Sequence, residues 1–242
     1  MLEPWRTGIV VNIEEVTPMT RRFFIKVPEV ERFDFSPGQF VTLDLPIHEK
    51  KNKRWRSYSI ASWPNGSNVF ELIIVYLEGG AGTSYLFNEV KEGTQLTLRG
   101  PQGVFILPEN IDKDLFLICT GTGVAPFRSM LHYIHQNNLA HKNIFLVFGT
   151  RVSKECLYYH ELKELEGSLD NYFYFPTFSR EPEENTLVRR GYVHHVYEEI
   201  AVEKKSPALF YLCGWKNMID EARQRILSLG YDKKDIHLEL YG

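Results

Sequence analysis

The apolar residues of this chain follow two different patterns, and the change between them near residue 108 constrains the fold more than any other feature. Before it, short alternating runs are separated by turn residues such as Ser36-Pro37-Gly38-Gln39. After it, continuous apolar runs alternate with segments of helical spacing. Alternation is typical of antiparallel strands with one buried face, whereas strand–helix alternation is typical of a parallel α/β sheet.

Each half therefore predicts its own domain. In the first half, the expected strands cover residues 9–16, 23–27, 40–45, 55–62, 69–77 and 94–99, with one helix at 83–90. These short, closely spaced strands indicate a small antiparallel barrel or sandwich. In the second half, the expected parallel strands cover residues 115–119, 144–148, 172–178, 208–213 and 236–240. We place the boundary in the polar stretch 108–113, which gives domains at 1–110 and 111–242.

The composition excludes several classes of protein. The 31 acidic and 28 basic residues give a net charge of −3, which argues against a protein that binds nucleic acid through bulk charge. The 3 cysteines are too few for a disulfide scaffold or an all-cysteine cluster, and we expect no metal site. No signal pattern opens the chain, and no apolar run reaches ~18 residues. We expect a cytoplasmic monomer that does not insert into membranes.

Two motifs in the first half are suited to a phosphorylated, flat ligand. Arg56 and Tyr58 share one face of a strand, with Ser59 on the other, so a guanidinium lies one pleat from an aromatic ring. An ordinary edge strand is the alternative. Gly82, Thr83 and Ser84 end a glycine-rich loop that opens a helix, a favourable place for a pyrophosphate. The alternative there is a flexible loop followed by a capped helix.

A third motif, Gly121-Thr122-Gly123 with Pro126, follows the apolar strand 115–119 and is half of a dinucleotide-binding fingerprint. The usual third glycine is replaced by Pro126, which suits the first turn of a helix. Residues 115–154 contain no Asp or Glu, so the acidic residue that normally binds a ribose diol is missing. This leaves room for a phosphorylated ribose.

A fourth motif lies at the end of the strand 172–178. Ser179 and Arg180 follow it directly, and Tyr192 comes shortly after. A hydroxyl, a guanidinium and a ring at the carboxyl end of a strand can hold a phosphate and an adenine. The alternative is a solvated basic loop that neighbouring glutamates, such as Glu181, neutralise.

The last two features are Cys213 and the C-terminal strand. Cys213 ends an apolar strand, and the alternative to a site role is a core thiol. No other cysteine is near it in the sequence, so we expect no redox pair. The strand with Glu239 closes on the aromatic Tyr241, followed by Gly242, and the alternative is a disordered terminus.

Taken together and in this order, the motifs resemble those of the ferredoxin–NADP+ reductase family of flavoproteins. The set also includes Gly100-Pro101-x-Gly103-x-Phe105 and the Ala125-Pro126-Phe127-Arg128 run, and the resemblance spans residues 9–242. The short segment 76–82 and the residue after Tyr241 are closer to bacterial members than to plant-type ones. The resemblance implies a Greek-key barrel that binds FAD, followed by a parallel five-stranded α/β domain that binds NADP.

The resemblance also implies roles for individual residues. Arg56 would grip the FAD pyrophosphate, Tyr58 and Tyr241 would cover the two flavin faces, and Cys213 and Glu239 would flank the nicotinamide. The implied FAD-binding residues are Arg56, Tyr58, Ser59, Gly82, Thr83, Ser84 and Tyr241. The implied NADP-binding residues are Gly121, Thr122, Gly123, Pro126, Ser179, Arg180 and Tyr192. The implied catalytic residues are Ser59, Cys213, Glu239 and Tyr241.

The implied function is hydride transfer between NADP(H) and flavin N5, with one-electron exchange to ferredoxin or flavodoxin. The stretch 50–56 has five basic residues in seven and is suited to steering an acidic carrier, or is simply a solvated loop. One alternative function is the NADH-dependent reductase component of an oxygenase system. Another, from a different class, is a non-catalytic module that senses NADP(H).

Overall fold

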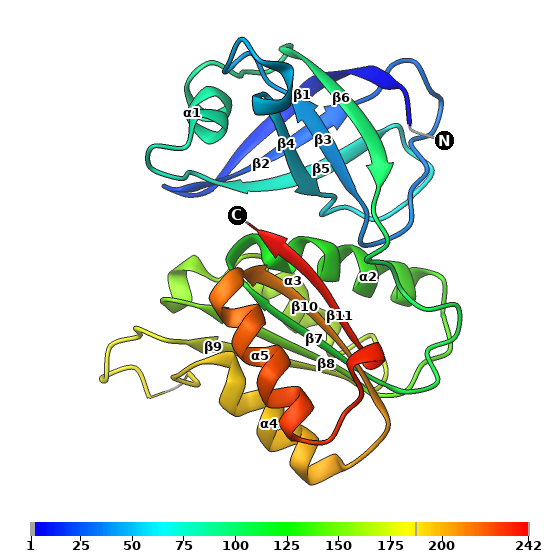
Figure 1. Ribbon diagram of the computed structural model, residues 1–242, viewed down its shortest axis with the longest axis vertical. Helices are drawn as coiled ribbons and strands as arrows, with labels where there is room; N and C mark the ends of the chain where they lie inside the picture. The colour runs from blue at the N-terminus through cyan, green and yellow to red at the C-terminus, as the bar shows by residue number, and fades with distance from the viewer. Residues whose placement is uncertain (1–2, 187, 242) are drawn as a thin grey trace. The chain divides into compact units, whose positions relative to one another are not determined.

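The computed structural model describes residues 3–186 and 188–241. They divide into two compact units, one formed by residues up to 107 together with 128–133, the other by 108–127 and the chain from 134 onward (Figure 1). Among the described residues, no helix is long and apolar enough to cross a membrane.

The first unit is the antiparallel barrel. Its strands are β1 (Trp5–Thr17), β2 (Thr20–Lys26), β3 (Phe40–Asp44), β4 (Trp55–Ser59), β5 (Val69–Val75) and β6 (Gln95–Gln102). They pair in the order β4-β3-β6-β1-β2-β5, so β6 returns between β3 and β1, as a Greek key requires. A bridge between Ile60 and Leu72 links the two edges of the sheet. The predicted Greek-key barrel is confirmed.

Local differences from the expected boundaries have physical causes. β4 ends at Ser59, three residues earlier than expected, because Ile60 donates its N–H to the Gln39 carbonyl (3.0 Å) and Ala61 donates to Glu71 (2.8 Å). Helix α1 (Ala81–Asn88) begins two residues before the expected start, since Gly80 takes the N-cap position. The 3₁₀ helix η1 (Lys51–Lys53) precedes β4.

The second unit is a parallel sheet between helices. Its strands are β7 (Asp114–Thr120), β8 (Ile144–Thr150), β9 (Tyr172–Phe178), β10 (Ala208–Trp215) and β11 (Ile236–Tyr241). They pair in the order β11-β10-β7-β8-β9, each pair parallel, as predicted. The helices are α2 (Val124–Gln136), α3 (Tyr159–Leu165), α4 (Val193–Lys204) and α5 (Lys216–Ser228), and the 3₁₀ helices are η2 (Gly121–Gly123), η3 (Ser153–Glu155) and η4 (Lys233–Asp235).

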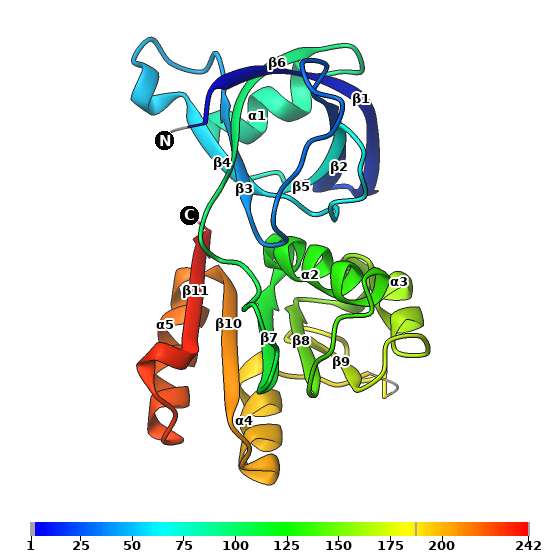
Figure 2. The ribbon, with the colours of Figure 1, turned by 90° about the vertical axis from the view of Figure 1, so that its right-hand side faces the viewer.

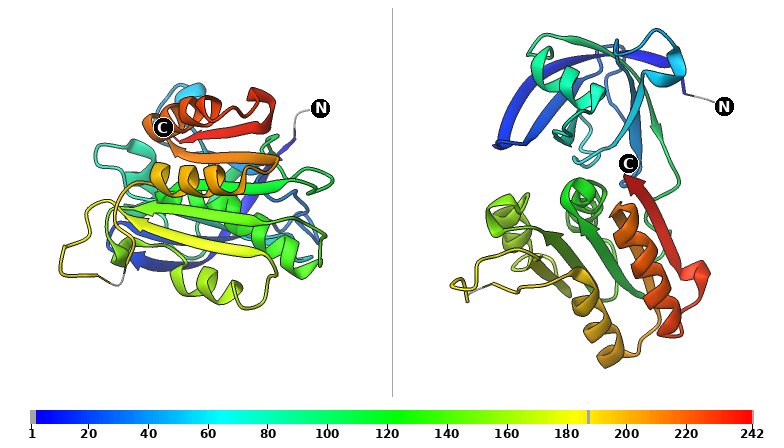
Figure 3. Two further views of the ribbon diagram at one scale, coloured as in Figure 1. Left: turned by 90° about the horizontal axis from the view of Figure 1, so that it is seen from below. Right: turned by 60° about the vertical axis from the view of Figure 1, so that its left-hand side comes forward.

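Helices cover both faces of this sheet, with α4 and α5 on one face and α3 on the other (Figures 2 and 3). One core cluster packs Phe116, Ile118 and Val147 of the strands against α4 and α5. The central strands are therefore buried on both sides, which explains their continuous apolar runs. The carboxyl ends of the five strands meet at one edge, where sheets of this class bind ligands.

Helix α2 contributes residues to both units, which the domain boundary predicted at 108–113 does not anticipate. Its apolar positions Phe127, Met130, Leu131 and Ile134 are all fully buried, as their helical spacing predicts. Its segment Arg128–Tyr133 nevertheless belongs to the first unit. The helix that opens at the Gly121 motif thus supplies residues to the barrel.

Two turn glycines give a test of the barrel's packing. Gly38 has φ +100°, and a Cβ there would lie 1.9 Å from the Phe105 carbonyl oxygen. Gly66 has φ +79°, with no described atom within 4 Å of a Cβ. We expect Gly66→Ala to destabilise by about 1–2 kcal/mol through backbone strain alone. Gly38→Ala should cost about 3 kcal/mol or more, because backbone must also move. Urea unfolding of both variants measures the difference, and equal costs would contradict the packing.

Candidate functional site

In the first unit, Arg56 lies against the start of α1. Its Nη1 donates to the carbonyls of Trp55 (2.8 Å) and Lys53 (3.1 Å), which hold the guanidinium in place. A Cβ at the buried Gly82 would lie 3.0 Å from Arg56 Cγ and 3.1 Å from Nε. A fixed positive charge therefore adjoins the first turn of a helix, whose N–H groups have no acceptor within the helix. This arrangement favours a diphosphate.

The Thr83 hydroxyl shapes the loop before α1. Thr83 Oγ1 accepts the Leu77 N–H (3.1 Å) and lies 3.1 Å from the carbonyl oxygens of Leu77 and Gly80, either of which can accept its proton. Ser84 donates its N–H to Gly80 (2.9 Å), as the first intrahelical bond. The predicted phosphate contact of Thr83 is thus left to its backbone N–H, whereas the hydroxyl fixes the turn.

The other two predicted residues of this strand are deeply placed. Tyr58 packs against the barrel core, and burial raises its pKa to about 12, with the nearby Arg56 opposing part of the shift. Ser59 is buried and pairs with Phe40 of β3. Arg56 therefore lies near both Gly82 and Tyr58, and the roles of these residues toward a flavin stay predictions.

In the second unit, the structure separates the roles of the two glycines in the Gly121 motif. Gly121 has φ +56° and makes the turn, with open space around a Cβ among the described residues. Gly123 lies against β10, because a Cβ there would be 2.4 Å from the Cys213 carbonyl oxygen. Thr122 lies between them in η2. Pro126 is the third residue of α2, where its missing N–H has no helical acceptor to lose.

Sequence reasoning missed Thr120, the last residue of β7. In the described structure its Oγ1 is buried without a hydrogen-bond partner, and it would lie 2.5 Å from a Cβ at Gly214. Gly214 has no Cβ and so avoids this clash, and its φ of +146° is one that other residues rarely adopt. The signal available in the sequence was a hydroxyl residue directly before the glycine turn. A buried hydroxyl at the carboxyl edge is suited to bonding a bound nucleotide.

Three predicted catalytic residues come together on neighbouring strands. Glu239 is in register with Cys213, and the Tyr241 side chain hydrogen-bonds to Cys213. Burial and the Glu239 charge raise the pKa of Cys213 well above its usual range, so the thiol is neutral. Cys119 of β7 is in register on the other side, but burial raises its pKa as well, so neither thiol is activated. Gly242 lies outside the described residues.

The fourth motif lies at the carboxyl end of β9. Ser179 donates its N–H to Thr150 (3.0 Å), and Arg180 donates to the Arg151 carbonyl (2.7 Å), which fixes the turn while the Arg180 side chain is exposed. Tyr192 precedes α4 and is 64% exposed. The backbone is thus fixed, and the Ser179 hydroxyl also donates to the Thr150 carbonyl (3.4 Å), while the Arg180 guanidinium and the Tyr192 ring stay accessible.

Among the described residues, Glu181 is bonded by neutral donors and not by Arg180. Its carboxylate accepts the Ser153 N–H (2.6 Å), the Ser153 hydroxyl (2.8 Å) and the Asn185 amide (2.7 Å), and the Ser153 N–H is the main cause of its lowered pKa. Within the described chain, ion pairs engage Arg189 with Glu199 (3.1 Å) and Arg190 with Glu183 (3.8 Å), and not Arg180. Arg180 is therefore the cation that this loop offers to a ligand.

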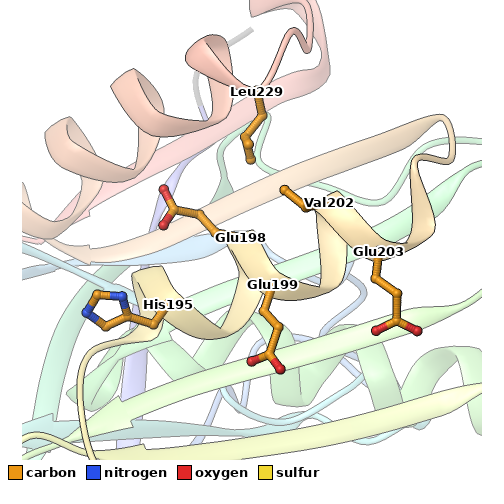
Figure 4. Close-up of a pocket in the computed structure, with 6 residues that line it drawn as sticks. All are labelled: His195, Glu198, Glu199, Val202, Glu203 and Leu229. Carbon is orange, nitrogen blue, oxygen red and sulfur yellow. The ribbon is translucent and has the colours of Figure 1, made fainter.

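A surface depression on α4 and α5 is not the candidate site. It is lined by His195, Glu198, Glu199, Val202, Glu203 and Leu229 (Figure 4). Glu198 is bonded to Arg225 (3.0 Å), so its carboxylate is already engaged. An acidic lining of this kind repels phosphates.

Comparison with known proteins matches both units to described families. Residues 7–106 match the oxidoreductase FAD-binding domain, and residues 117–224 match the oxidoreductase NAD-binding domain. Ferredoxin–NADP reductase B of Sorangium cellulosum strain So ce56 is 34% identical over 99% of this chain and 98% of that protein. The phenol hydroxylase P5 protein of Acinetobacter pittii is 28% identical over 96% of this chain, which spans 64% of that longer protein.

Solved structures show the same fold. A ferredoxin NADP+ reductase from Neisseria gonorrhoeae with bound FAD and NADP has a TM-score of 0.80 at 24% identity and covers 98% of each chain. The Amycolatopsis cytochrome P450 reductase GcoB has a TM-score of 0.86 at 24% identity, covering 98% of this chain and 70% of that one.

The two motif glycines give the test of this edge. We expect Gly123→Ala to destabilise the protein by about 2 kcal/mol or more, because its methyl meets the Cys213 backbone. Gly121→Ala should cost only about 1–2 kcal/mol of backbone strain, while its methyl enters the space where a nucleotide would approach. Thermal unfolding and NADP+ titration of both variants measure this. A larger loss of stability for Gly121→Ala would contradict the assignment.

Proposed function

The chain belongs to the ferredoxin–NADP+ reductase family of FAD- and NAD(P)-binding oxidoreductases, and we propose that it transfers hydride between NADP(H) and FAD and exchanges single electrons with a ferredoxin or flavodoxin. The similarity to a ferredoxin–NADP reductase covers 99% of this chain and 98% of that protein, which supports this proposal. The choice of NADP(H) rests on Arg180, whose side chain is exposed on a fixed turn at the carboxyl edge of the sheet.

The residues of the first unit fit FAD. The space that a Cβ at Gly82 would fill is taken by the Arg56 side chain, which leaves a guanidinium and helix N–H groups for the diphosphate. Tyr58 would lie on a flavin face, and Ser59 would bond the ring near N5. FAD, when bound, accepts a hydride at N5 and passes electrons on singly. The chain's part is to stack the ring, bond its edge and exclude water.

The residues of the second unit fit a nicotinamide dinucleotide. The turn at Gly121 and the first turn of α2 would receive the pyrophosphate, and the buried Thr120 hydroxyl would gain the partner it lacks in the described structure. The neutral Cys213 thiol would pack beside the nicotinamide without covalent chemistry. Glu239 and Tyr241 complete the catalytic set that we propose.

A 2′-phosphate is suited to this edge better than a bare ribose. Arg180 and Ser179 offer a charge-assisted pair, and Tyr192 offers a ring for the adenine. Residues 115–154 supply no carboxylate for a ribose diol. The proposed cofactor is therefore NADPH in preference to NADH.

The test of the function is spectroscopic. The purified protein should show the visible absorption band of oxidised flavin, and anaerobic NADPH should bleach it faster than NADH. Adding oxidised ferredoxin or flavodoxin should then restore the band. A protein that binds NADPH but holds no reducible flavin would instead be a non-catalytic sensor.

A second candidate function is the NADH-dependent reductase component of an oxygenase system. The similarity to the phenol hydroxylase P5 protein favours it, although that protein extends beyond the matched 64%. The same titration decides between the two, because this function requires NADH to bleach the flavin at least as fast as NADPH.

We also propose where the electron carrier docks. Lys50, Lys51 and Lys53 are exposed beside β4, whereas Arg54 is paired with Asp44 at 2.7 Å. Next to this loop the Arg99 guanidinium lies 4.8 Å from the Trp5 ring and 5.3 Å from the Trp55 ring. Arg99 is half-buried, whereas Trp5 and Trp55 are exposed. Exposed Trp side chains with a cationic rim are typical of docking surfaces for acidic proteins.

A cytoplasmic location is part of the proposal. The three cysteines are all free thiols, which fits a reducing compartment.

Arg180 gives the test of cofactor choice. We expect Arg180→Ala to raise the NADPH KM about 10–100-fold, since a hydrogen bond to a charged group is worth roughly 1.5–3 kcal/mol. The NADH KM should stay nearly unchanged. Arg189→Ala is the matched control, because Arg189 is already paired with Glu199 and should leave the NADPH/NADH ratio of kcat/KM as it is. Equal losses with both cofactors would place the phosphate elsewhere.

The lysine loop gives the test of the docking surface. Replacing Lys50, Lys51 and Lys53 by Glu should slow reduction of an acidic carrier about tenfold at low salt and flatten its salt dependence. Flavin reduction by NADPH should not change. In the control, Lys204, Lys233 and Lys234 of the second unit are replaced by Glu, and the rate of carrier reduction should stay that of the wild type. An unchanged rate in the loop variant would remove the loop from the docking surface.

A further inference from the structure

A buried carboxylate on β5 is held by two arginines. Glu71 is 3% exposed and accepts two bonds from Arg22, at 2.7 Å from Nε and 3.0 Å from Nη2. Arg128 Nη1 donates to Glu71 Oε2 (3.0 Å), the oxygen that also accepts the Arg22 Nη2 bond, and Arg128 is 4% exposed. Arg22 also pairs with Glu14 at 2.7 Å. The result is an ionic cluster inside the first unit.

Arg128 reaches this cluster from far away in the sequence. It lies on α2, 57 residues from Glu71, yet its segment belongs to the first unit. The Trp63 ring lies 5.1 Å from its guanidinium, and His132, one turn later, stacks on Trp63 with centroids 4.0 Å apart. Arg128 and its neighbours thus hold the chain that follows β4.

The segment held in this way carries Ser59. Arg128 Nη1 donates to the Ala61 carbonyl at 2.9 Å. Ala61 donates its N–H to the Glu71 carbonyl (2.8 Å), and Glu71 donates its N–H to the Ser62 hydroxyl (3.0 Å). Ala61 is therefore bonded through both its N–H and its carbonyl, two residues beyond Ser59.

Stability alone does not explain such a cluster. Burying ion pairs brings a desolvation cost that often cancels the attraction between the charges, so apolar replacements of similar volume are frequently as stable. What a buried ionic cluster supplies is geometry, since a planar guanidinium bonds only in set directions. The geometry fixed here is that of the end of β4.

We propose that Arg128 is a positioning residue of the flavin site: by bonding the Ala61 carbonyl and the Glu71 carboxylate, it fixes the segment that carries Ser59. This rests on the proposed function, in which Ser59 bonds the flavin near N5. Hydride transfer depends steeply on placement, so a shift of this segment slows the reaction without touching either cofactor.

The experiment compares Arg128→Met and Arg128→Lys with Arg225→Met, a control that removes a half-exposed ionic cluster between α4 and α5. The measurements are FAD content, the visible circular dichroism of the flavin, the NADP+ dissociation constant and the anaerobic rate of flavin reduction by NADPH. For Arg128→Met we expect a changed flavin dichroism and a rate roughly 10–100-fold lower per bound FAD, with unchanged NADP+ affinity. Arg128→Lys should recover part of the rate, and Arg225→Met should match the wild type.

If Arg128→Met does not fold, the double variant Glu71→Gln/Arg128→Met, which removes both buried charges, takes its place in the experiment. We expect the same lower rate and changed dichroism for it as for Arg128→Met. A wild-type rate and dichroism per bound FAD in either variant, with only a lower melting temperature, would overturn the positioning role. Failure of the proposed function is a different result, because the wild type itself would then show no flavin reduction by NADPH.

Discussion

The close approach of Gly123 to the Cys213 carbonyl is the contact on which the nucleotide-binding edge depends. It sets η2 against the end of β10, and only a residue without a side chain permits it. The same approach places Gly214 against the Thr120 hydroxyl. Because parallel strands end at a common edge, these contacts gather the Gly121 turn, Cys213 and the strand with Glu239 in one place.

The barrel also packs a group against a glycine, but there the group is a cationic side chain and not a backbone carbonyl. At α1, the space of a missing Cβ at Gly82 is filled by the Arg56 side chain, so a charge rather than a carbonyl occupies the gap. Both sites place a glycine at the start of a helix, where N–H groups lack acceptors. The fold therefore offers two places that suit an anion, each made from a helix start and a side chain or strand end packed against a glycine.

The distribution of charge on the second unit is consistent with a phosphorylated cofactor. Of the carboxylates near the β9 turn, Glu181 is bonded by Ser153 and Asn185, Glu199 is paired with Arg189, and Glu183 lies 3.8 Å from Arg190. Arg180 is thus left to face a ligand. The acidic depression on α4 includes Glu199 itself, and its glutamates repel phosphates. Membership of the family alone leaves the choice between NADPH and NADH open, and it is this local charge pattern that favours NADPH.

The sequence by itself determined the two-domain class, the strands and the order of the motifs. Burial imposes an alternating or a continuous apolar pattern on each strand, and a glycine turn depends only on residues that are neighbours in the chain. Tertiary structure alone decided where β4 ends, since Ile60 and Ala61 find their partners at Gln39 and Glu71. It also decided that Cys119 lies beside Cys213, that Glu181 is engaged by Ser153, and that Arg128 completes the barrel. Each of these contacts joins residues 10 to 94 positions apart, and a pattern read along the chain carries no information about which distant group will satisfy a buried polar atom.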